Sequence, residues 1–310
     1  MWLVNRVDPP LLRHHFSMIR RKTFELKLRS GVLKLGERTL VMGVLNVTPD
    51  SFSDGGKFLD VKRAVVRAVA MQRDGADIID IGAESTRPGS VGISAAQEMR
   101  RLLPVLEALR GKLKIPISVD TQKAAVAELA LRAGAEIVND ISSLRSNPQL
   151  ARVAAEHGAP LILMHMRGTP RTMQKGPFAR NVMRDVVSGL LKSIAIAKQF
   201  CVKRTQIVID PGIGFGKSYA QNYELLAKLP ELAKLGYPVM VGTSRKGFLG
   251  ATLARHGRPA SVDERVWATA ATVAASILNG AHIVRVHDVA EMKQVALAMD
   301  VLLYTNASRR

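Results

Sequence analysis

The sequence predicts an α/β protein, a (β/α)8 TIM barrel whose one mouth is plugged by an N-terminal β-hairpin. Three observations lead to this fold class. Eight short apolar runs alternate with helical segments, each run ends in a polar residue, and the chain of 310 residues is 47% hydrophobic. A single α/β barrel of roughly 250 residues fits this length.

The apolar runs are rich in Val and Ile and short enough to be buried strands. They are residues 41–47, 78–82, 117–120, 137–141, 161–165, 207–210, 239–244 and 283–287. Segments between them, such as "QKAAVAELALRAGAE", have Ala- and Leu-rich helical patterns closed by Gly, a typical C-cap. Eight strand–helix repeats favour a parallel barrel; a doubly wound sheet is the alternative.

A polar residue stands at the carboxyl end of each run. In order these residues are Asn46, Asp80, Asp120, Asn139, His165, Asp210, Ser244 and the pair Arg285/His287. A single Asp in such a place commonly caps a helix. Eight in succession indicate a site, because strand ends converge on the face where barrel enzymes have their active sites. The long polar loop "NVTPDSFSDGG" after the first run is expected to overhang that face.

The segment before the first run, "FELKLRSGVLKLGERTLVMG", predicts the plugging hairpin, with a turn at Ser30-Gly31. Residues 1–22 are basic and lack the apolar core and cleavage site of a secretory signal. We therefore expect an irregular basic extension over residues 1–22 and a single domain over residues 23–310.

Composition limits the partners. The formal net charge of +19 suits nucleic acid or anionic small molecules. Aromatic residues are only 5% and no stacking motif lies among the basic residues, so we expect a basic surface without specific nucleic-acid binding. Cys201 is the one cysteine, which excludes an internal disulfide framework and favours a cytoplasmic setting. No apolar run reaches the roughly 18 residues of a membrane span.

Three glycine-rich or basic motifs indicate an anionic, flat ligand. In "DPGIGFGKS" Pro211 replaces the first glycine of a Walker loop, and Lys217 replaces the third glycine of a dinucleotide fingerprint. Its glycines are expected instead to let backbone approach a flat ligand. The turn "GTSRKGFLG" and the strand end "RVHD" bring basic side chains after the last two strands, where barrels often bind phosphate.

The acidic and amide strand ends suit a heterocycle. Asp120, Asn139 and Asp210 offer donors and acceptors for an aminopyrimidine-like edge. Thr86 and Arg87 lie in the turn-rich loop "AESTRPGS". His165 is a candidate base, although a lone histidine is more often structural.

Taken together, these segments resemble the dihydropteroate synthases of folate biosynthesis. The matching motifs run in order through most of the chain: "MGVLNVTPDSFSDGG", "DIGAESTRPG", "SVDT", "IVNDIS", "MHMRGTP", "IDPGIGFGK", "TSRK" and "RVHDV". The resemblance implies a TIM-barrel transferase that joins p-aminobenzoate to a dihydropterin methyl diphosphate with Mg²⁺, releasing pyrophosphate. It also implies a homodimer and a sulfonamide target. Pterin-binding barrels of cobalamin-dependent methyltransferases share the strand-end Asp/Asn set, but are not expected to carry the first two loops.

The resemblance also implies residue roles. Asn46 would coordinate the metal together with the diphosphate. The pterin would be held by Asp120, Asn139, Asp210 and Lys246, with Phe215 among the substrate-binding residues. Thr86, Arg87, Arg285 and His287 would contact substrate, mainly at the diphosphate, and Phe52, Pro88 and Lys246 would border the p-aminobenzoate pocket. Asp120, Lys246 and Arg285 are the expected catalytic residues.

The chain departs from the family pattern in places. Ala83 replaces a glycine, Ile213 an aromatic, and Gly247 a common serine that would contact the p-aminobenzoate carboxylate. Backbone N–H groups at the next helix could serve instead. A binding protein or inactive paralogue is the second function class; it would be favoured by loss of Asp120, Lys246 or Arg285, and all three are present.

Overall fold

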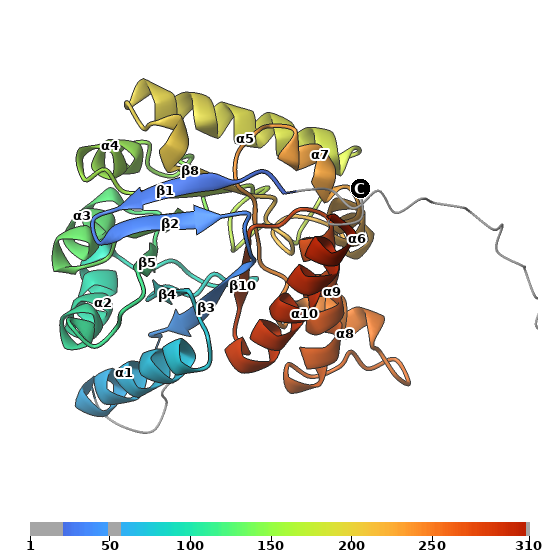
Figure 1. Cartoon of the computed structure of the whole chain (residues 1–310), viewed down its shortest axis with the longest axis horizontal. Helices are drawn as coiled ribbons and strands as arrows, with labels where there is room; N and C mark the ends of the chain where they lie inside the picture. Colours follow the sequence, from blue (N-terminus) through green and yellow to red (C-terminus); the bar gives the residue numbers. More distant parts are fainter. Residues whose placement is uncertain (1–20, 49–56, 308–310) are drawn as a thin grey trace, which may run out of the picture.

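The computed structural model describes residues 21–48 and 57–307 (Figure 1). Its centre is an eight-stranded parallel sheet in the order β8-β7-β6-β5-β4-β3-β10-β9. The strands are β3 (Leu40–Asn46), β4 (Ile78–Gly82), β5 (Ile117–Asp120), β6 (Ile137–Asp140), β7 (Leu161–Met164), β8 (Ile207–Asp210), β9 (Met240–Val241) and β10 (Ile283–Val286). All eight predicted runs are strands; β6, β7, β9 and β10 end before the predicted runs do, and the other four keep the predicted length.

The sheet closes on itself. A parallel bridge joins Ile209 of β8 to Val239, and the N–H of Ile209 donates to the carbonyl of Pro238 at 2.9 Å. Closure leaves no open edge in the eight-stranded sheet and excludes the doubly wound alternative. The predicted barrel is confirmed.

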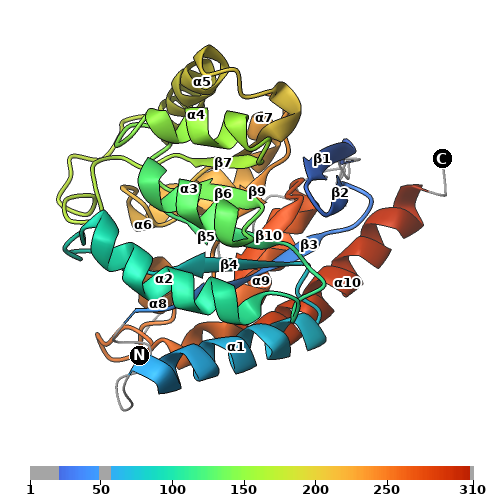
Figure 2. The ribbon, with the colours of Figure 1, turned by 90° about the vertical axis from the view of Figure 1, so that its left-hand side faces the viewer.

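Helices surround the barrel (Figures 1 and 2). They are α1 (Lys57–Arg73), α2 (Ala95–Leu109), α3 (Ala124–Ala133), α4 (Gln149–Glu156), α5 (Val182–Gln199), α6 (Tyr219–Ala227), α7 (Leu229–Ala233), α8 (Gly247–Thr252), α9 (Val266–Leu278) and α10 (Val289–Ala307), with short 3₁₀ turns η2 (Arg204–Gln206) and η3 (Asp263–Arg265). Local sequence sets several starts: Ser94 and Ser218 form capping boxes with Gln97 and Gln221. No helix in the described ranges is long and apolar enough to cross a membrane.

The predicted hairpin is present as β1 (Phe24–Leu28) and β2 (Gly31–Leu35), paired antiparallel. Leu26 and Leu35 are buried against the strand starts, including Leu40, Ile78 and Ile137. Figure 2 shows the hairpin at one end of the barrel and the arrowhead of β4 pointing to the other. The hairpin therefore covers the amino-terminal mouth and leaves the carboxyl mouth for ligands.

The last residues of the predicted basic extension are attached to the barrel. The buried Arg21 pairs with Asp300 of α10 at 2.5 Å, and Thr39 donates to the same carboxylate through its backbone N–H at 2.7 Å. Residues 1–20 lie outside the described ranges.

Candidate active site

A pocket opens at the carboxyl mouth, and alternation along the strands decides what lines it. In β3, Leu40 and Met42 belong to the inner cluster and Val44 faces the pocket. Eight predicted site residues line the pocket: Thr86, Asp120, Asn139, Asp210, Phe215, Lys246, Arg285 and His287. These residues come from seven different segments, and only closure of the barrel brings them together.

An arginine between two carboxylates forms the pocket floor. Arg285 donates from Nε to Asp80 at 2.6 Å and from Nη2 to Asp120 at 2.8 Å. Asp80 is fully buried and also accepts from the Asn139 amide at 3.0 Å. Asp80 belongs to the series of polar strand ends, but no motif in the sequence assigns it a role. The structure shows that it orients both Arg285 and Asn139.

Three buried oxygens in this floor have no partner in the described part of the chain: Asp80 Oδ1, Asn139 Oδ1 and Ser118 Oγ. Buried acceptors are normally hydrogen-bonded. Because the Asn139 nitrogen donates to Asp80, its oxygen is left as an acceptor in the pocket lining. The site therefore has acceptors ready for the N–H groups of a heterocycle.

Burial shifts the protonation of the charged groups. It raises the pKa of Asp120 to about 7, against the lowering effect of Arg285 and with a further rise from Asp80. Burial also raises the pKa of Asp210, while Lys246 opposes this shift. The pKa of Lys246 falls to about 7 through burial, although Asp210 holds it up. The neutral and charged forms of Asp120 and of Lys246 thus lie close in free energy near pH 7.

Lys246 is held against the Gly-rich loop. Its ammonium donates to the carbonyl of Ile213 and lies 4.4 Å from the centroid of the Phe215 ring. Gly214 has φ +83°, and a Cβ there would stand 2.8 Å from Lys246 Cδ. The loop and the lysine form one wall of the pocket.

The other glycines of this loop serve contacts within the protein. Gly212 has φ +66°, and a Cβ there would lie 1.9 Å from the carbonyl oxygen of His165. Beneath the loop, buried Lys217 donates to the carbonyls of His165 and Phe215 at 2.9 and 3.0 Å. The close approach expected from these glycines is therefore made, at Gly212, to the segment after β7.

The basic side chains of the turns after β9 and β10 point in different directions. Arg245 is turned to Asp288, with contacts of 2.9 and 2.5 Å, whereas Lys246 lines the pocket. His287 contacts the Ser244 hydroxyl through its backbone N–H at 3.1 Å and through Nδ1 at 3.0 Å. The pKa of His287 is lowered to about 4, chiefly by burial and next by the positive charge of Arg285. The imidazole is therefore neutral near pH 7.

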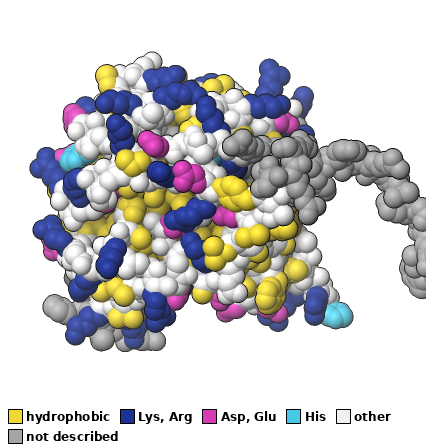
Figure 3. Space-filling view, in the orientation of Figure 1, with side chains coloured by type: hydrophobic (Ala, Val, Ile, Leu, Met, Phe, Trp, Pro, Cys, Tyr) yellow, Lys and Arg dark blue, Asp and Glu magenta, His cyan; other side chains and the backbone are white. Residues whose placement is uncertain are grey.

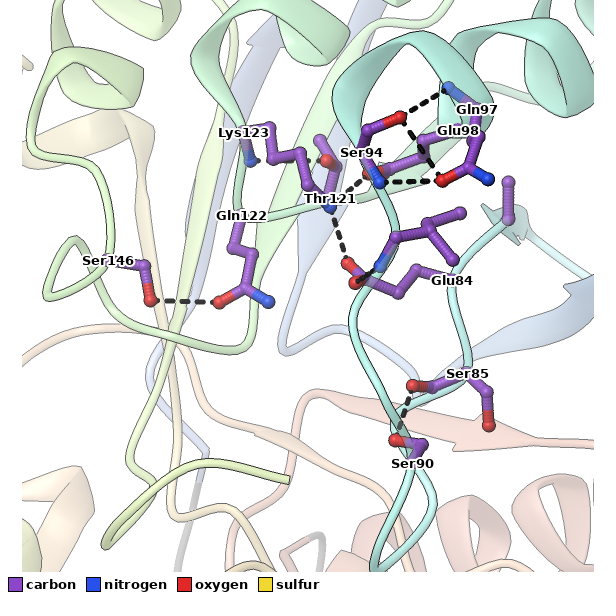
Figure 4. Close-up of polar contacts among 12 residues, drawn as sticks. Glu84, Ser85, Ser90, Ser94, Gln97, Glu98, Thr121, Gln122, Lys123 and Ser146 are labelled. Atoms are coloured by element: carbon purple, nitrogen blue, oxygen red, sulfur yellow. Dashed lines mark hydrogen bonds and ion pairs between the residues drawn. The ribbon is translucent and has the colours of Figure 1, made fainter. Parts of the chain in front are cut away.

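The loop after β4 is fixed from below by an ion cluster (Figure 4). Lys123 donates to Glu84 at 2.7 Å and to Glu98 of α2 at 2.6 Å. The second oxygen of Glu84 accepts from the backbone N–H of Ile93 at 2.9 Å. Sequence reasoning missed this cluster, because its members are far apart in the chain and carry no motif of their own.

Some predicted site residues lie elsewhere. Arg87 and Pro88, next to Thr86, are exposed and do not line the pocket. Asn46 ends β3 with a half-buried side chain on the same inward face as Val44, also outside the pocket lining. Phe52 lies outside the described residues. No group of three His, Cys, Asp or Glu side chains within the described ranges could hold a metal ion.

The comparisons with known proteins identify the family. The family model "Pterin binding enzyme" matches residues 42–287. A dihydropteroate synthase of Synechocystis sp. is 48% identical over 267 residues, covering 86% of this chain and 91% of the relative; that of Bacillus subtilis is 45% identical over 282 residues, covering 91% and 95%. A Xanthomonas albilineans dihydropteroate synthase structure with 4-aminobenzoic acid has a TM-score of 0.83 at 38% identity, covering 92% of this chain and 99% of that one.

The chain is a barrel whose carboxyl mouth presents Asp120, Asn139, Asp210 and Lys246, and it belongs to the pterin-binding enzymes. Within that family it belongs to the dihydropteroate synthases. These are transferases that form dihydropteroate from a dihydropterin diphosphate and p-aminobenzoate.

Proposed function

We propose that the carboxyl mouth catalyses this transfer by electrostatic stabilisation, without a nucleophilic residue. The observation that carries the proposal is the buried Asp80–Arg285–Asp120 arrangement beside Asp210 and Lys246. Its two carboxylates share a single guanidinium, so one negative charge remains uncompensated within the arrangement when both are ionised. That charge lies where a cationic substrate carbon would be stabilised most.

The reaction breaks the bond between the pterin methylene carbon and the diphosphate oxygen, and the electron pair leaves with the diphosphate. The methylene becomes positively charged and is attacked by the amino nitrogen of p-aminobenzoate, which then loses a proton. We assign stabilisation of the cation to Asp120. Asn139 and Asp210 would accept hydrogen bonds from the pterin ring, and Lys246 would hold the opposite edge.

The leaving diphosphate would lie on the side of Arg285 and His287. Arg285 is a permanent cation, and neutral His287 keeps an N–H that can donate to a phosphate oxygen. Thr86 adds a hydroxyl from the loop after β4. Because Arg285 already pairs with Asp80 and Asp120, the hydrogen-bond donors of His287 and Thr86 would carry most of the protein's stabilisation of the departing charge.

The residues present fit a magnesium ion that arrives with its substrate. Mg²⁺ usually keeps several waters and is held by one or two protein carboxylates plus substrate phosphates. Here the carboxamide oxygen of Asn46 would take the place of such a carboxylate. When bound, the ion would neutralise the diphosphate oxygens. Asn46 would then fix the position of the diphosphate under the first loop.

The p-aminobenzoate side is proposed to lie beyond Lys246, toward Arg87 and Pro88. Arg87 could pair with the substrate carboxylate, and Gly247 begins α8, where free backbone N–H groups are available. A Yersinia pestis dihydropteroate synthase, 40% identical with a TM-score of 0.83, has been solved as a sulfonamide drug complex. We propose that sulfonamides compete with p-aminobenzoate for the same place here.

We further propose that the enzyme is a cytoplasmic homodimer. Exposed apolar side chains gather on α10, at Leu297, Val301 and Leu302, with Trp267 of the neighbouring α9 83% exposed. Figure 3 shows apolar side chains among the charged ones on the face where α10 lies. A second copy would cover them. Light scattering of the purified chain should give twice the monomer mass, and a monomer at micromolar concentration would refute the proposal.

Pyrophosphate release with both substrates tests the function. We expect turnover only with dihydropterin diphosphate, p-aminobenzoate and Mg²⁺ together, and loss of turnover with EDTA. Tight binding of pteroate without turnover would instead favour the inactive paralogue. Undiminished turnover in EDTA would show that the metal-binding role proposed for Asn46 is wrong.

A further inference from the structure

A second cavity lies on the outer side of β7, away from the pocket described above. Strand alternation separates the two: Met164 faces the pterin pocket, while the next residue, His165, faces outward toward α5. The cavity has a volume of about 250 Å³ and lies between α5 and the segments that follow β6 and β7. We name it the α5 cavity. It shares no lining residue with the pterin pocket.

The helix side of the α5 cavity is formed by one face of α5. Its residues recur at helical spacing, namely Asp185, Ser188, Gly189, Lys192 and Ser193. Gly189 is required, because a Cβ there would stand 2.5 Å from Cδ2 of His165. The imidazole is thereby packed against the helix, with its edge at the cavity.

The charge in the cavity wall is mainly positive. Arg145, Arg167 and Lys192 line it, and Asp185 is the one acidic side chain among its described lining residues. Arg145 is held in place by donating to the carbonyls of Ser142 and Gly168 at 3.0 and 3.2 Å. Arg167 forms one long ion pair, from Nη1 to the carboxylate of Asp185 at 3.3 Å. Arg145 and Lys192 form no salt bridge within the described residues, so their charges remain available to an incoming anion.

Behind His165 lies a buried cation without a carboxylate partner. Lys217 donates to Nδ1 of His165 at 3.0 Å and to two backbone carbonyls, and forms no salt bridge within the described residues. A charged ammonium can only donate, so we assign the proton of the neutral ring to Nε2. That N–H faces Asp185 at 3.5 Å, too far for a good hydrogen bond. Ser143 Oγ, also in the lining, is buried without a partner.

From this geometry we propose that the α5 cavity is a second anion-binding site, which takes a phosphate-type oxyanion. Arg145, Arg167 and Lys192 would supply positive charge, and His165 would donate from Nε2. The volume holds a phosphate or diphosphate with a few waters, since one water takes about 30 Å³. A multivalent oxyanion matches several fixed donors better than a carboxylate does.

The test follows histidine side chains by ¹⁵N NMR while inorganic phosphate is added at constant ionic strength. His165 reports on the α5 cavity and His287 on the pterin pocket, so the two sites are read separately in the same sample. Signals are assigned with His165→Gln and His287→Gln. We expect the His165 signal to shift and saturate, and acetate at equal ionic strength to give less than about a fifth of that shift.

Two charge reversals on the same helix provide the matched comparison. Lys192→Glu alters the cavity, whereas Lys198→Glu makes the same change at an exposed position of α5 outside it. Reversal of a charge roughly 6 Å from the anion should weaken phosphate binding about tenfold, and Lys198→Glu should change it less than about twofold. A shift of His287 alone, equal weakening by both substitutions, an unsaturable His165 shift or an equal response to acetate would each overturn the proposal.

Discussion

Replacing Asp120 by Asn tests the electrostatic mechanism most directly. The substitution removes one charge at nearly constant volume, and the position remains next to Arg285 Nη2. A carboxylate about 5 Å from the developing cation, at an effective dielectric constant near 20, stabilises it by about 3 kcal/mol. We therefore expect turnover to fall by two to three orders of magnitude.

The stability of the Asp120→Asn variant, unlike its turnover, should not fall. Burial raises the folded pKa of Asp120 to about 7 from an ordinary carboxyl value, so the protonated form is the one favoured by folding. The stabilising contribution is present at acid pH and is lost as the pH rises through 7. At pH 8 the ionised carboxylate is unfavourable, and Arg285 keeps its bond to Asp80 when Asp120 is replaced. The variant should thus melt at the same or a higher temperature.

The assay is pyrophosphate release by wild type and Asp120→Asn at saturating substrates, with circular dichroism and thermal melting on the same samples. A large rate loss with an unchanged or higher Tm supports electrostatic stabilisation by the carboxylate. A native variant with wild-type turnover would refute it. A large fall in Tm at pH 8 would show that the charge is structural.

Three further predictions follow from the same geometry. The pH profile of kcat/KM should be a narrow bell near pH 7, since Asp120 loses its charge below about pH 7 and Lys246 loses its charge above about pH 7. The profile of Asp120→Asn should lack the fall on the acid side, and a flat wild-type profile from pH 6 to 8 would contradict both assignments. Lys123→Met should lower Tm and raise the KM for p-aminobenzoate at least about fivefold, because the carboxylates of Glu84 and Glu98 lose their cation. Lys112→Met, at an exposed position, is the control; equal KM values for the two variants would show that the loop does not need this anchor. Gly212→Ala should lower the free energy of unfolding in urea by more than about 3 kcal/mol, because its Cβ would meet a backbone oxygen. Gly158→Ala, also at positive φ but with nothing within 4 Å, should lower it by about 1 kcal/mol. Equal losses would mean that the loop changes its conformation to accommodate the Cβ at position 212.

The sequence by itself determined the strand–helix repeat, the plugging hairpin and the convergence of strand-end polar residues. These are local signals, because a strand of period two and a helix of period 3.6 are written in consecutive residues. Asp120, Asn139, Asp210 and Arg285 could be assigned to one site because parallel strands in a barrel end on the same face.

Tertiary structure alone decided the partners of these residues. The role of Asp80 depends on Arg285, 205 residues away, and the anchor formed by Glu84, Lys123 and Glu98 joins three separate elements. The turn after β9 shows the same limit: Arg245 and Lys246 are adjacent in sequence, yet the first is paired with Asp288 and the second faces the pocket. Sequence gives each side chain its chemistry and its face, but burial and ion pairing are set by which distant segments the closed barrel brings within a few ångströms.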